Sequence, residues 1–174
     1  FENKEIRAAS NGVQFIDLQD LYHSYLFTNI SRANQRYTYN PDINGNFVIT
    51  ALDVDNPDVE ADYAEVHFSL QYPKLEDGQD IFVYGNFNNY ELEEATRMEY
   101  FEEEGIYTTS FLLKQGFYNY KYVILNKDNT IDHDKIGGSF WQTENNYKVI
   151  VYYRELGTRY DKVIGLGEKN SVGI

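Results

Sequence analysis

The chain of 174 residues contains no cysteine, which excludes disulfide bonds, thiolate nucleophiles and cysteine-ligated metal sites. It also lacks a long hydrophobic run, and this excludes a membrane-spanning helix and argues against direct membrane insertion. Basic residues are scarce, because 15 Lys and Arg stand against 28 Asp and Glu, for a formal net charge of −13. Since nucleic acids are bound largely through basic side chains, this balance argues against a nucleic-acid partner.

Aromatic residues, by contrast, are abundant. The 17 Tyr, 11 Phe and single Trp make up 17% of the chain, enough to build a buried core, and they argue against wholesale disorder. The sequence starts at Phe1 without a methionine or a signal-like segment. We therefore expect it to be an excerpt of a longer protein.

Alternation of apolar and polar residues recurs along the chain. In 63–70 every second residue is apolar, and Glu65, His67 and Ser69 fall between, which predicts a half-buried strand. Helix-like spacing with helix caps is missing, so we expect at most a turn or two of helix. The pattern predicts an all-β fold, an antiparallel sandwich. Its further strands are Ile81–Tyr84, Ile106–Leu113, Tyr118–Leu125 and Tyr147–Tyr153.

The first sixty residues predict a separate β unit. Asn11 and Gly12 form a strong hairpin signal between strands at 5–9 and 13–18, and the acidic segment 53–60 is expected to be a linker. Further strands are expected at 22–29, 35–39 and 47–52. The predicted organisation is therefore 1–60 as strands of a preceding β domain plus linker, 61–156 as the sandwich, and 157–174 as a C-terminal extension. Four apolar residues of that extension are expected to pack on the preceding strands: Tyr160, Val163, Ile164 and Leu166.

The histidines and acidic residues of the sequence offer little support for a catalytic site or for a bound cofactor. The three histidines, His23, His67 and His133, are far apart in sequence and lie in no catalytic motif, so we expect a protein that is not an enzyme. One acidic cluster has a spacing that calcium could use, but it lacks the frame of an EF-hand loop, and turn and cap chemistry explains it better. Its members are Asp53, Asp55, Asp58 and Glu60, and Asp42, Asn44 and Asn46 form a weaker set.

Three segments resemble the glycogen-binding and family-48 carbohydrate-binding modules, which are Ig-like sandwiches of the E-set type. They are Ile81-Phe-Val-Tyr-Gly-Asn-Phe-Asn-Asn-Tyr90, Gly116-Phe-Tyr-Asn-Tyr-Lys-Tyr-Val123 and Asn145-Asn-Tyr-Lys-Val-Ile-Val151. The resemblance implies an Ig-like sandwich over 61–156. We expect a tight turn that uses left-handed Gly and Asn residues at 85–89, with the Asn side chains bonded to the loop's own backbone and Tyr90 presented after it.

The same resemblance implies a sugar site, but one with parts missing. Tyr90 stands at the first stacking position, and Lys121 and Asn145 are equivalents of the polar sugar ligands. No aromatic occurs at 129–132, where a second stacking residue is expected, and Trp141 lies just before the final strand without a clear equivalent. An α-glucan-binding module, or an accessory domain of a glycan-active enzyme, is therefore the alternative function.

A resemblance over nearly the whole chain points to the plug family of the type IX secretion system. It is carried by the blocks 53–68, 140–147 and 151–165, in this order. Such proteins are implied to lie in the periplasm, where they bind a large outer-membrane translocon barrel and close its periplasmic opening. The resemblance thus implies a non-enzymatic plug or gating subunit, associated with the outer membrane through its partner. Arg154 and Arg159 in the last block are either interface anchors or, in our favoured interpretation, partners of local carboxylates and Tyr rings.

Overall fold

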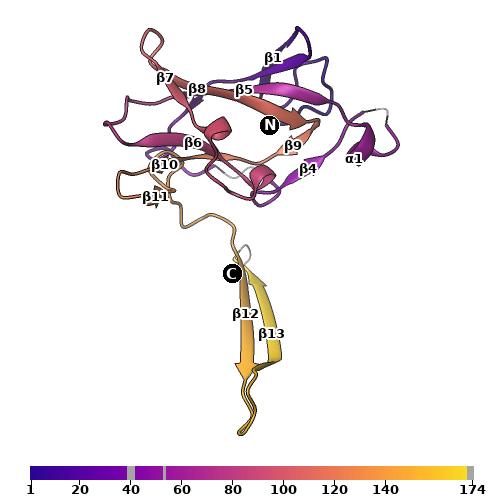
Figure 1. Ribbon diagram of the computed structural model, residues 1–174, viewed down its shortest axis with the longest axis vertical. Coiled ribbons are helices and arrows are strands. Elements are labelled where there is room, and N and C mark those ends of the chain that lie inside the picture. The colour runs from indigo at the N-terminus through magenta and orange to yellow at the C-terminus, as the bar shows by residue number, and fades with distance from the viewer. Residues whose placement is uncertain (39–41, 53, 172–174) are drawn as a thin grey trace. The chain divides into compact units, whose positions relative to one another are not determined.

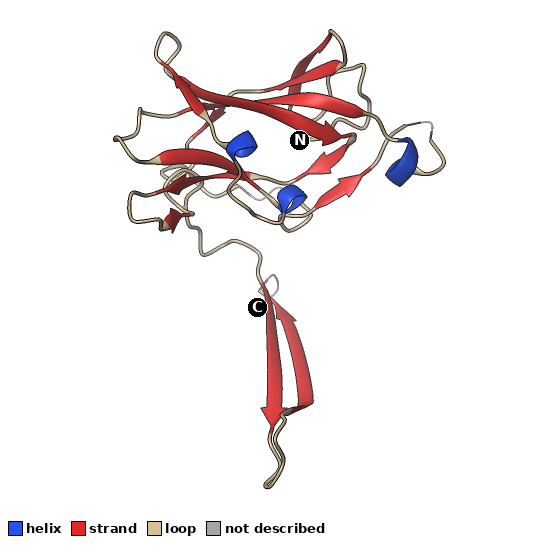
Figure 2. Cartoon of the chain, in the orientation of Figure 1, coloured by secondary structure: helices blue, strands red, loops and turns tan. Residues whose placement is uncertain are grey.

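The structure is a computed structural model that describes residues 1–38, 42–52 and 54–171. Strands dominate it and helices are limited to single short turns, which confirms the all-β prediction (Figure 2). The chain divides into two units, Phe1–Ser139 and Phe140–Ile174. No helix in the described ranges is long and apolar enough to cross a membrane.

The first unit is a sandwich whose larger layer is a six-stranded sheet, ordered β1-β2-β5-β8-β7 with β3 also paired to β5 (Figure 1). Alternation in the sequence sets which residues of β5 face inwards: Ala64, Val66, Phe68 and Leu70 are buried, while Glu65 and its alternate neighbours point outwards. The strands are β1 (Val13–Leu18), β2 (Tyr22–Leu26), β3 (Asn29–Ile30), β5 (Tyr63–Gln71), β7 (Glu99–Phe101) and β8 (Ile106–Lys114).

The opposite layer holds two smaller sheets, one ordered β11-β10-β6 and one that pairs β4 with β9. Side chains of both layers meet in one core, in which Phe68 and Leu70 of the larger sheet join Ile81 and Ile124 of the smaller one. The strands are β4 (Phe47–Ile49), β6 (Asp80–Tyr84), β9 (Gly116–Tyr118), β10 (Lys121–Leu125) and β11 (Ile131–Asp132). The short helices are α1 (Pro57–Glu60), η1 (Asn86–Asn88) and η2 (Glu94–Thr96).

The predicted boundary at residue 60 is wrong, because the N-terminal strands complete the same sandwich. Val13 of β1 and Leu26 of β2 are buried in the shared core. The side chain of Gln115 also ties the segments together, since its Oε1 accepts from the Asp62 amide at 3.0 Å and its Nε2 donates to the Lys4 carbonyl at 2.8 Å. The described part of the acidic segment, 54–60, is therefore a connection within one unit, and it includes the single turn α1.

The sheet is also not antiparallel throughout. Strands β2 and β3 run parallel to β5, with Tyr22 opposite Ala64 and Asn29 opposite Leu70. A parallel pair requires a crossover of a dozen or more residues. The segment between β3 and β5, which contains β4 and α1, provides that crossover.

Two strands predicted in the first sixty residues do not form. Segment 5–9 contains turns and bends instead of the first arm of a hairpin, because the preceding residues pair elsewhere: Glu2 forms a bridge with Phe117 of β9. Residues 35–38 are likewise not a strand, since the Gln35 amide donates to the Arg32 carbonyl in a turn. Tyr39, the last residue of that predicted strand, lies outside the described residues.

The second unit is a two-stranded antiparallel hairpin of β12 (Asn146–Tyr153) and β13 (Lys162–Asn170). Two predictions are corrected here. Strand β12 belongs to the second unit and pairs with β13, so it is not a strand of the sandwich, and 157–174 is not a separate extension, because most of its described residues form β13. The four residues expected to be buried in this extension are all exposed, by 60% to 64%: Tyr160, Val163, Ile164 and Leu166.

Candidate functional site

A cavity of about 550 Å³ lies at the end of β6, in the smaller layer of the sandwich. The rings of Tyr84 and Tyr90 line it, with centroids 5.2 Å apart and an angle of 44° between their planes. His133 approaches the Tyr84 ring edge-on at 5.4 Å, and the Lys121 ammonium lies 6.0 Å from the centre of the same ring. Two aromatic surfaces, a cation and an imidazole therefore converge on one cavity.

The backbone after β6 turns sharply to present Tyr90. Gly85 is required there by close packing, since a Cβ atom would lie 2.4 Å from the Phe87 ring and 3.0 Å from the Asn119 carbonyl oxygen. Asn89 and Tyr90 both have positive φ angles, 57° and 60°. Such a conformation is rare for a bulky residue such as tyrosine, and rare backbone conformations often mark functional positions.

The predicted tight turn at 85–89 is therefore present, as the single turn η1, but its details differ from the prediction. Gly85 is extended and only Asn89 is left-handed. Asn88 bonds its own loop through the Glu91 carbonyl, whereas Asn86 Nδ2 donates to Asn46 Oδ1 of a different loop at 2.7 Å.

The loop at 42–46 contributes Asp42 and Gly45 to the lining of the cavity. The Tyr90 hydroxyl donates to the Gly45 carbonyl at 3.0 Å, so the ring is held in place from both ends. Asn119 Oδ1 accepts from the amides of Ile43 and Gly45 and fixes the loop further. Asp42 Oδ1 accepts from the Asn44 amide at 2.9 Å, which is the Asx-turn chemistry expected for this weaker acidic set. The cavity is therefore largely preformed.

Of the residues predicted from the carbohydrate-module resemblance, the structure brings together Tyr90 and Lys121. It places Asn145 and Trp141 in the second unit. Asn145 closes the base of the hairpin, where its amide donates to Ser171 Oγ at 2.8 Å and its side chain donates to the Thr143 carbonyl. Trp141 is 90% exposed.

The two arginines lie on the segment that connects β12 to β13. Arg154 makes a two-pronged ion pair with Asp161, with Nε–Oδ1 and Nη2–Oδ2 distances of 2.8 Å and 3.0 Å. The hydrogen bond to Asp161 raises the pKa of Arg154. This confirms the favoured interpretation of Arg154 as a partner of a local carboxylate. Within the described ranges Arg159 forms no ion pair, so it stays a candidate interface residue.

The acidic segment contains cap chemistry. Glu60 Oε1 accepts from the Asn56 amide at 2.9 Å across the single turn α1, and Asp55 and Asp58 lie on the same segment. Asp53 lies outside the described residues. Among the residues that the structure describes, no three or more His, Asp or Glu side chains are grouped so that they could hold a metal ion.

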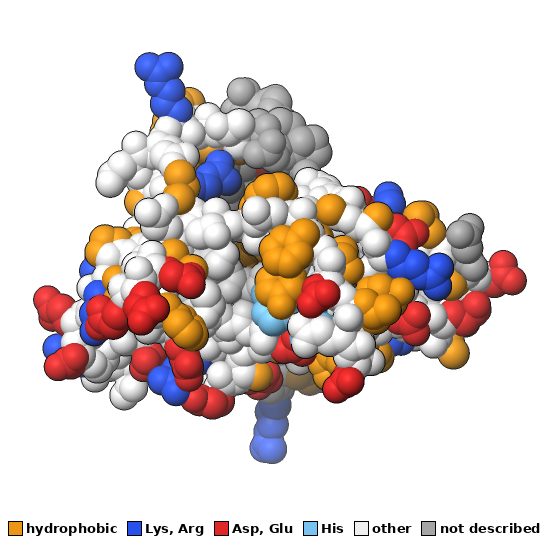
Figure 3. Space-filling view, turned by 90° about the horizontal axis from the view of Figure 1, so that it is seen from above, with side chains coloured by type: hydrophobic (Ala, Val, Ile, Leu, Met, Phe, Trp, Pro, Cys, Tyr) orange, Lys and Arg blue, Asp and Glu red, His pale blue; other side chains and the backbone are white. Residues whose placement is uncertain are grey.

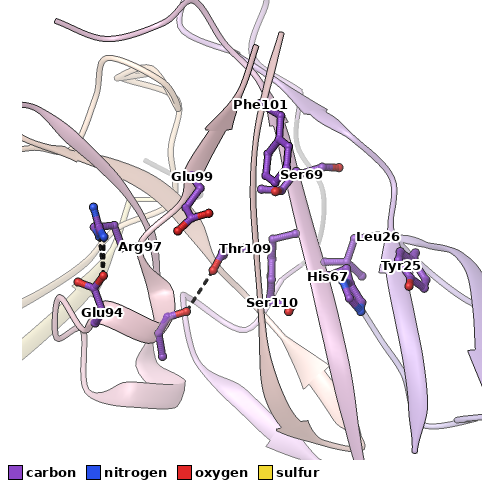
Figure 4. Close-up of a pocket in the computed structure, with 13 residues that line it drawn as sticks. Tyr25, Leu26, His67, Ser69, Glu94, Arg97, Glu99, Phe101, Thr109 and Ser110 are labelled. Carbon is purple, nitrogen blue, oxygen red and sulfur yellow. Dashed lines mark hydrogen bonds and ion pairs between the residues drawn. The ribbon is translucent and has the colours of Figure 1, made fainter. Parts of the chain in front are cut away.

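Two features of the structure are not predicted from the sequence: part of the cavity lining and a contact between two histidines. The sequence predicts only a strand for Tyr84 and no motif for His133, although both side chains line the cavity and the Tyr84 ring provides its second aromatic surface. The second missed feature is a contact between His23 and His67 on the outer face of the six-stranded sheet, with Nδ1 and Nε2 2.8 Å apart. A second cavity, of about 620 Å³, opens beside His67 (Figure 4).

Comparisons with known proteins support the fold more than a function. No family model matches the sequence, and no curated protein matches it. The chain is similar to the crystal structure of a hypothetical protein from Parabacteroides merdae ATCC 43184, with a TM-score of 0.85 and 34% sequence identity. That match covers 98% of this chain and 43% of the other, so this chain spans less than half of the length of its structural relative.

Proposed function

We propose that the protein is a non-enzymatic binding subunit that docks another protein through its hairpin unit. In this proposal it serves as the periplasmic plug of a type IX secretion translocon and binds the large outer-membrane barrel. The sequence resemblance supports this role, and two of its three blocks, 140–147 and 151–165, fall in the unit Phe140–Ile174.

The observation that carries the proposal is the apolar surface of the hairpin. Every residue of β12 is exposed, and the hairpin has no second layer of its own to cover either face. A two-stranded hairpin is marginally stable alone in water, and large exposed apolar patches mark interaction sites. Its large exposed apolar residues are Tyr147, Val149, Ile150, Val151, Tyr152, Tyr153, Val163, Ile164 and Leu166.

The pairing register gives the two faces of the hairpin different shapes. On one face Val149 lies opposite Gly167 and Val151 lies opposite Gly165, so bare backbone runs beside a row of valines. A partner can approach this strip closely, since nothing lies within 4 Å of a Cβ placed on Gly167. On the other face Ile150 lies opposite Leu166 and Tyr152 opposite Val163, which forms a continuous apolar ridge.

Co-purification from an outer-membrane extract tests the proposal. The full-length protein is expected to retain a very large β-barrel protein, and Val149→Ser and Ile150→Ser, one on each face, show which face is bound. Val59→Ser is the matched control, because Val59 is 75% exposed but lies on α1 in the first unit. A wild-type protein that retains no barrel, or hairpin variants that retain as much as the control, would refute the proposed docking.

Binding of α-glucans is a second candidate function, favoured by the cavity at the end of β6. Tyr84 and Tyr90 present two aromatic surfaces, and Lys121 offers a hydrogen-bond donor beside them. Aromatic rings with adjacent polar groups suit sugar rings, which have apolar faces and hydroxyl edges. The tilt of 44° between the rings fits a curved chain better than a flat one.

Calorimetric titration with maltoheptaose separates this candidate from the first. Saturable binding that is lost in both Tyr84→Ala and Tyr90→Ala, and kept in Tyr63→Ala, would establish the sugar site. Tyr63 is a suitable control because it is 55% exposed on β5, outside the cavity lining. Absence of binding by the wild-type protein would exclude this candidate and leave the docking proposal unaffected.

A further inference from the structure

Two histidines contact each other where the ribbon formed by β1 and β2 joins the rest of the six-stranded sheet. His23 on β2 and His67 on β5 place Nδ1 and Nε2 2.8 Å apart, within hydrogen-bond distance, and both rings are partly buried. One nitrogen must donate and the other must accept for this contact to be attractive. The pair therefore depends on the number of protons that it carries.

A stack of rings extends the contact across the sheet. The His67 ring lies on Tyr25 of β2 with centroids 4.1 Å apart, and Tyr25 lies on Phe15 of β1 at 4.4 Å. Figure 3 looks onto this face, where histidine atoms lie next to apolar side chains and acidic side chains lie nearby. The stack thus connects β5 to both strands of the ribbon formed by β1 and β2.

We propose that the His23–His67 pair is an acid-sensitive latch that holds the β1–β2 ribbon against β5. In the neutral pair, one ring N–H donates to the other ring's bare nitrogen. The first added proton keeps this bond, since a protonated ring still faces a neutral acceptor and the bond becomes charge-assisted. The second proton removes the acceptor, so that two donors and two positive charges face each other and the bond breaks.

Charged and polar groups on the neighbouring strands surround the pair. Glu65 of β5 and Asp17 of β1 are the sheet neighbours of His23, and Ser110 of β8 is the neighbour of His67. Burial lowers the pKa of His67, the facing imidazole lowers it further, and Glu65 opposes both effects. The pair titrates as a unit, and its second step falls at the lower pH.

The cavity beside His67 adds a mixed set of charges from the neighbouring loop and edge strand. There Arg97 is held by Glu94, through a hydrogen bond from Nε at 3.0 Å, and by Asp80 at 3.5 Å, so its charge is already balanced (Figure 4). Glu99 lines the same cavity. Neither Glu94 nor Glu99 is among the groups that shift the pKa of His67, whose charged neighbours are His23 and Glu65.

The latch lies at the strand pair that attaches the β1–β2 ribbon to the rest of the sheet. Strand β1 pairs with β2, and β2 pairs with β5 over four residue pairs, from Tyr22 with Ala64 to Tyr25 with His67. When the latch opens, the ribbon is expected to loosen first, and this would expose Val13 and Leu26, which are 2% and 4% accessible in the closed form.

The test measures thermal unfolding of the whole chain between pH 7.5 and 5 for the wild type, His67→Gln and His133→Gln. Glutamine can hydrogen bond to His23 but carries no charge, and His133 is the matched control because it lies at the other cavity. Since the unfolded chain binds a proton that the latched form excludes, acidification should destabilise the wild type. Its unfolding constant should rise by up to about tenfold per pH unit below about 6.5. His133→Gln should retain this dependence and His67→Gln should lose it.

Histidine signals in NMR provide a second measurement on the intact wild type. The pair is expected to titrate in two separated steps, with faster amide exchange in 13–26 appearing at the second step. Equal pH dependence in the wild type and His67→Gln, or two histidines that titrate independently at their ordinary pKa, would overturn the proposal.

Discussion

Replacing Gln115 with alanine tests whether the first sixty residues and the sandwich are one cooperative unit. The Gln115 side chain is buried and makes two hydrogen bonds to backbone groups that lie on both sides of the expected boundary, the Asp62 amide and the Lys4 carbonyl. In Gln115→Ala both groups lose their partner. A buried polar group without a partner costs about 1–3 kcal/mol, so we expect a loss of about 2–4 kcal/mol in the free energy of unfolding.

Urea denaturation followed by far-UV circular dichroism measures this loss. The matched control is Gln35→Ala, because Gln35 makes one exposed hydrogen bond to the Ser31 carbonyl and its removal should change the free energy by less than about 0.5 kcal/mol. Gln115→Ala should lower the midpoint of a single transition of the sandwich. A loss below about 1 kcal/mol, or the separate unfolding of an N-terminal part, would refute the one-unit architecture.

Three further predictions concern the core, the turn before the cavity and the hairpin. Phe68→Ala should cost about 3–5 kcal/mol in urea denaturation, because Phe68 is 1% exposed at the centre of the core. Gly85→Ala should cost about 1–3 kcal/mol in the same assay, since the new Cβ would overlap the Phe87 ring, and it should also weaken any ligand binding at Tyr90. Arg154→Ala should leave the thermal midpoint unchanged within error, because its ion pair with Asp161 is exposed to solvent.

The features that could be predicted from the sequence are those set by neighbouring residues. The inward row of β5 follows directly from its alternation, and the turn at 85–89 follows from its Gly and Asn residues. The partners of each strand, in contrast, depend on contacts far along the chain. A polar acidic segment such as 53–60 has the same composition whether it links two domains or connects β4 to β5 within one unit, so composition alone does not locate the boundary.

The candidate site shows the same division. Tyr90 and Lys121 could be predicted because they lie in recognisable motifs, and the structure brings them together. Tyr84 escaped prediction because it ends a run of buried strand residues, where an aromatic is usually a core residue. The contact between His23 and His67 spans 44 residues and depends on the parallel register of β2 and β5, which no local pattern indicates.

The hairpin has a strongly apolar sequence, but the described residues of its own unit do not provide the layers that would cover its faces. The run from Val149 to Val151 is apolar without alternation, and such runs are typical of strands that are covered on both faces. In the described part of its unit β13 is the only other strand, so it can satisfy the hydrogen bonds of one edge and cover neither face. A sequence that is patterned for burial but forms a two-stranded unit supports the proposal that a partner covers the hairpin. The glycines opposite Val149 and Val151 make this surface smooth on one face, which is why substitutions on the two faces separately can identify the side to which the partner binds.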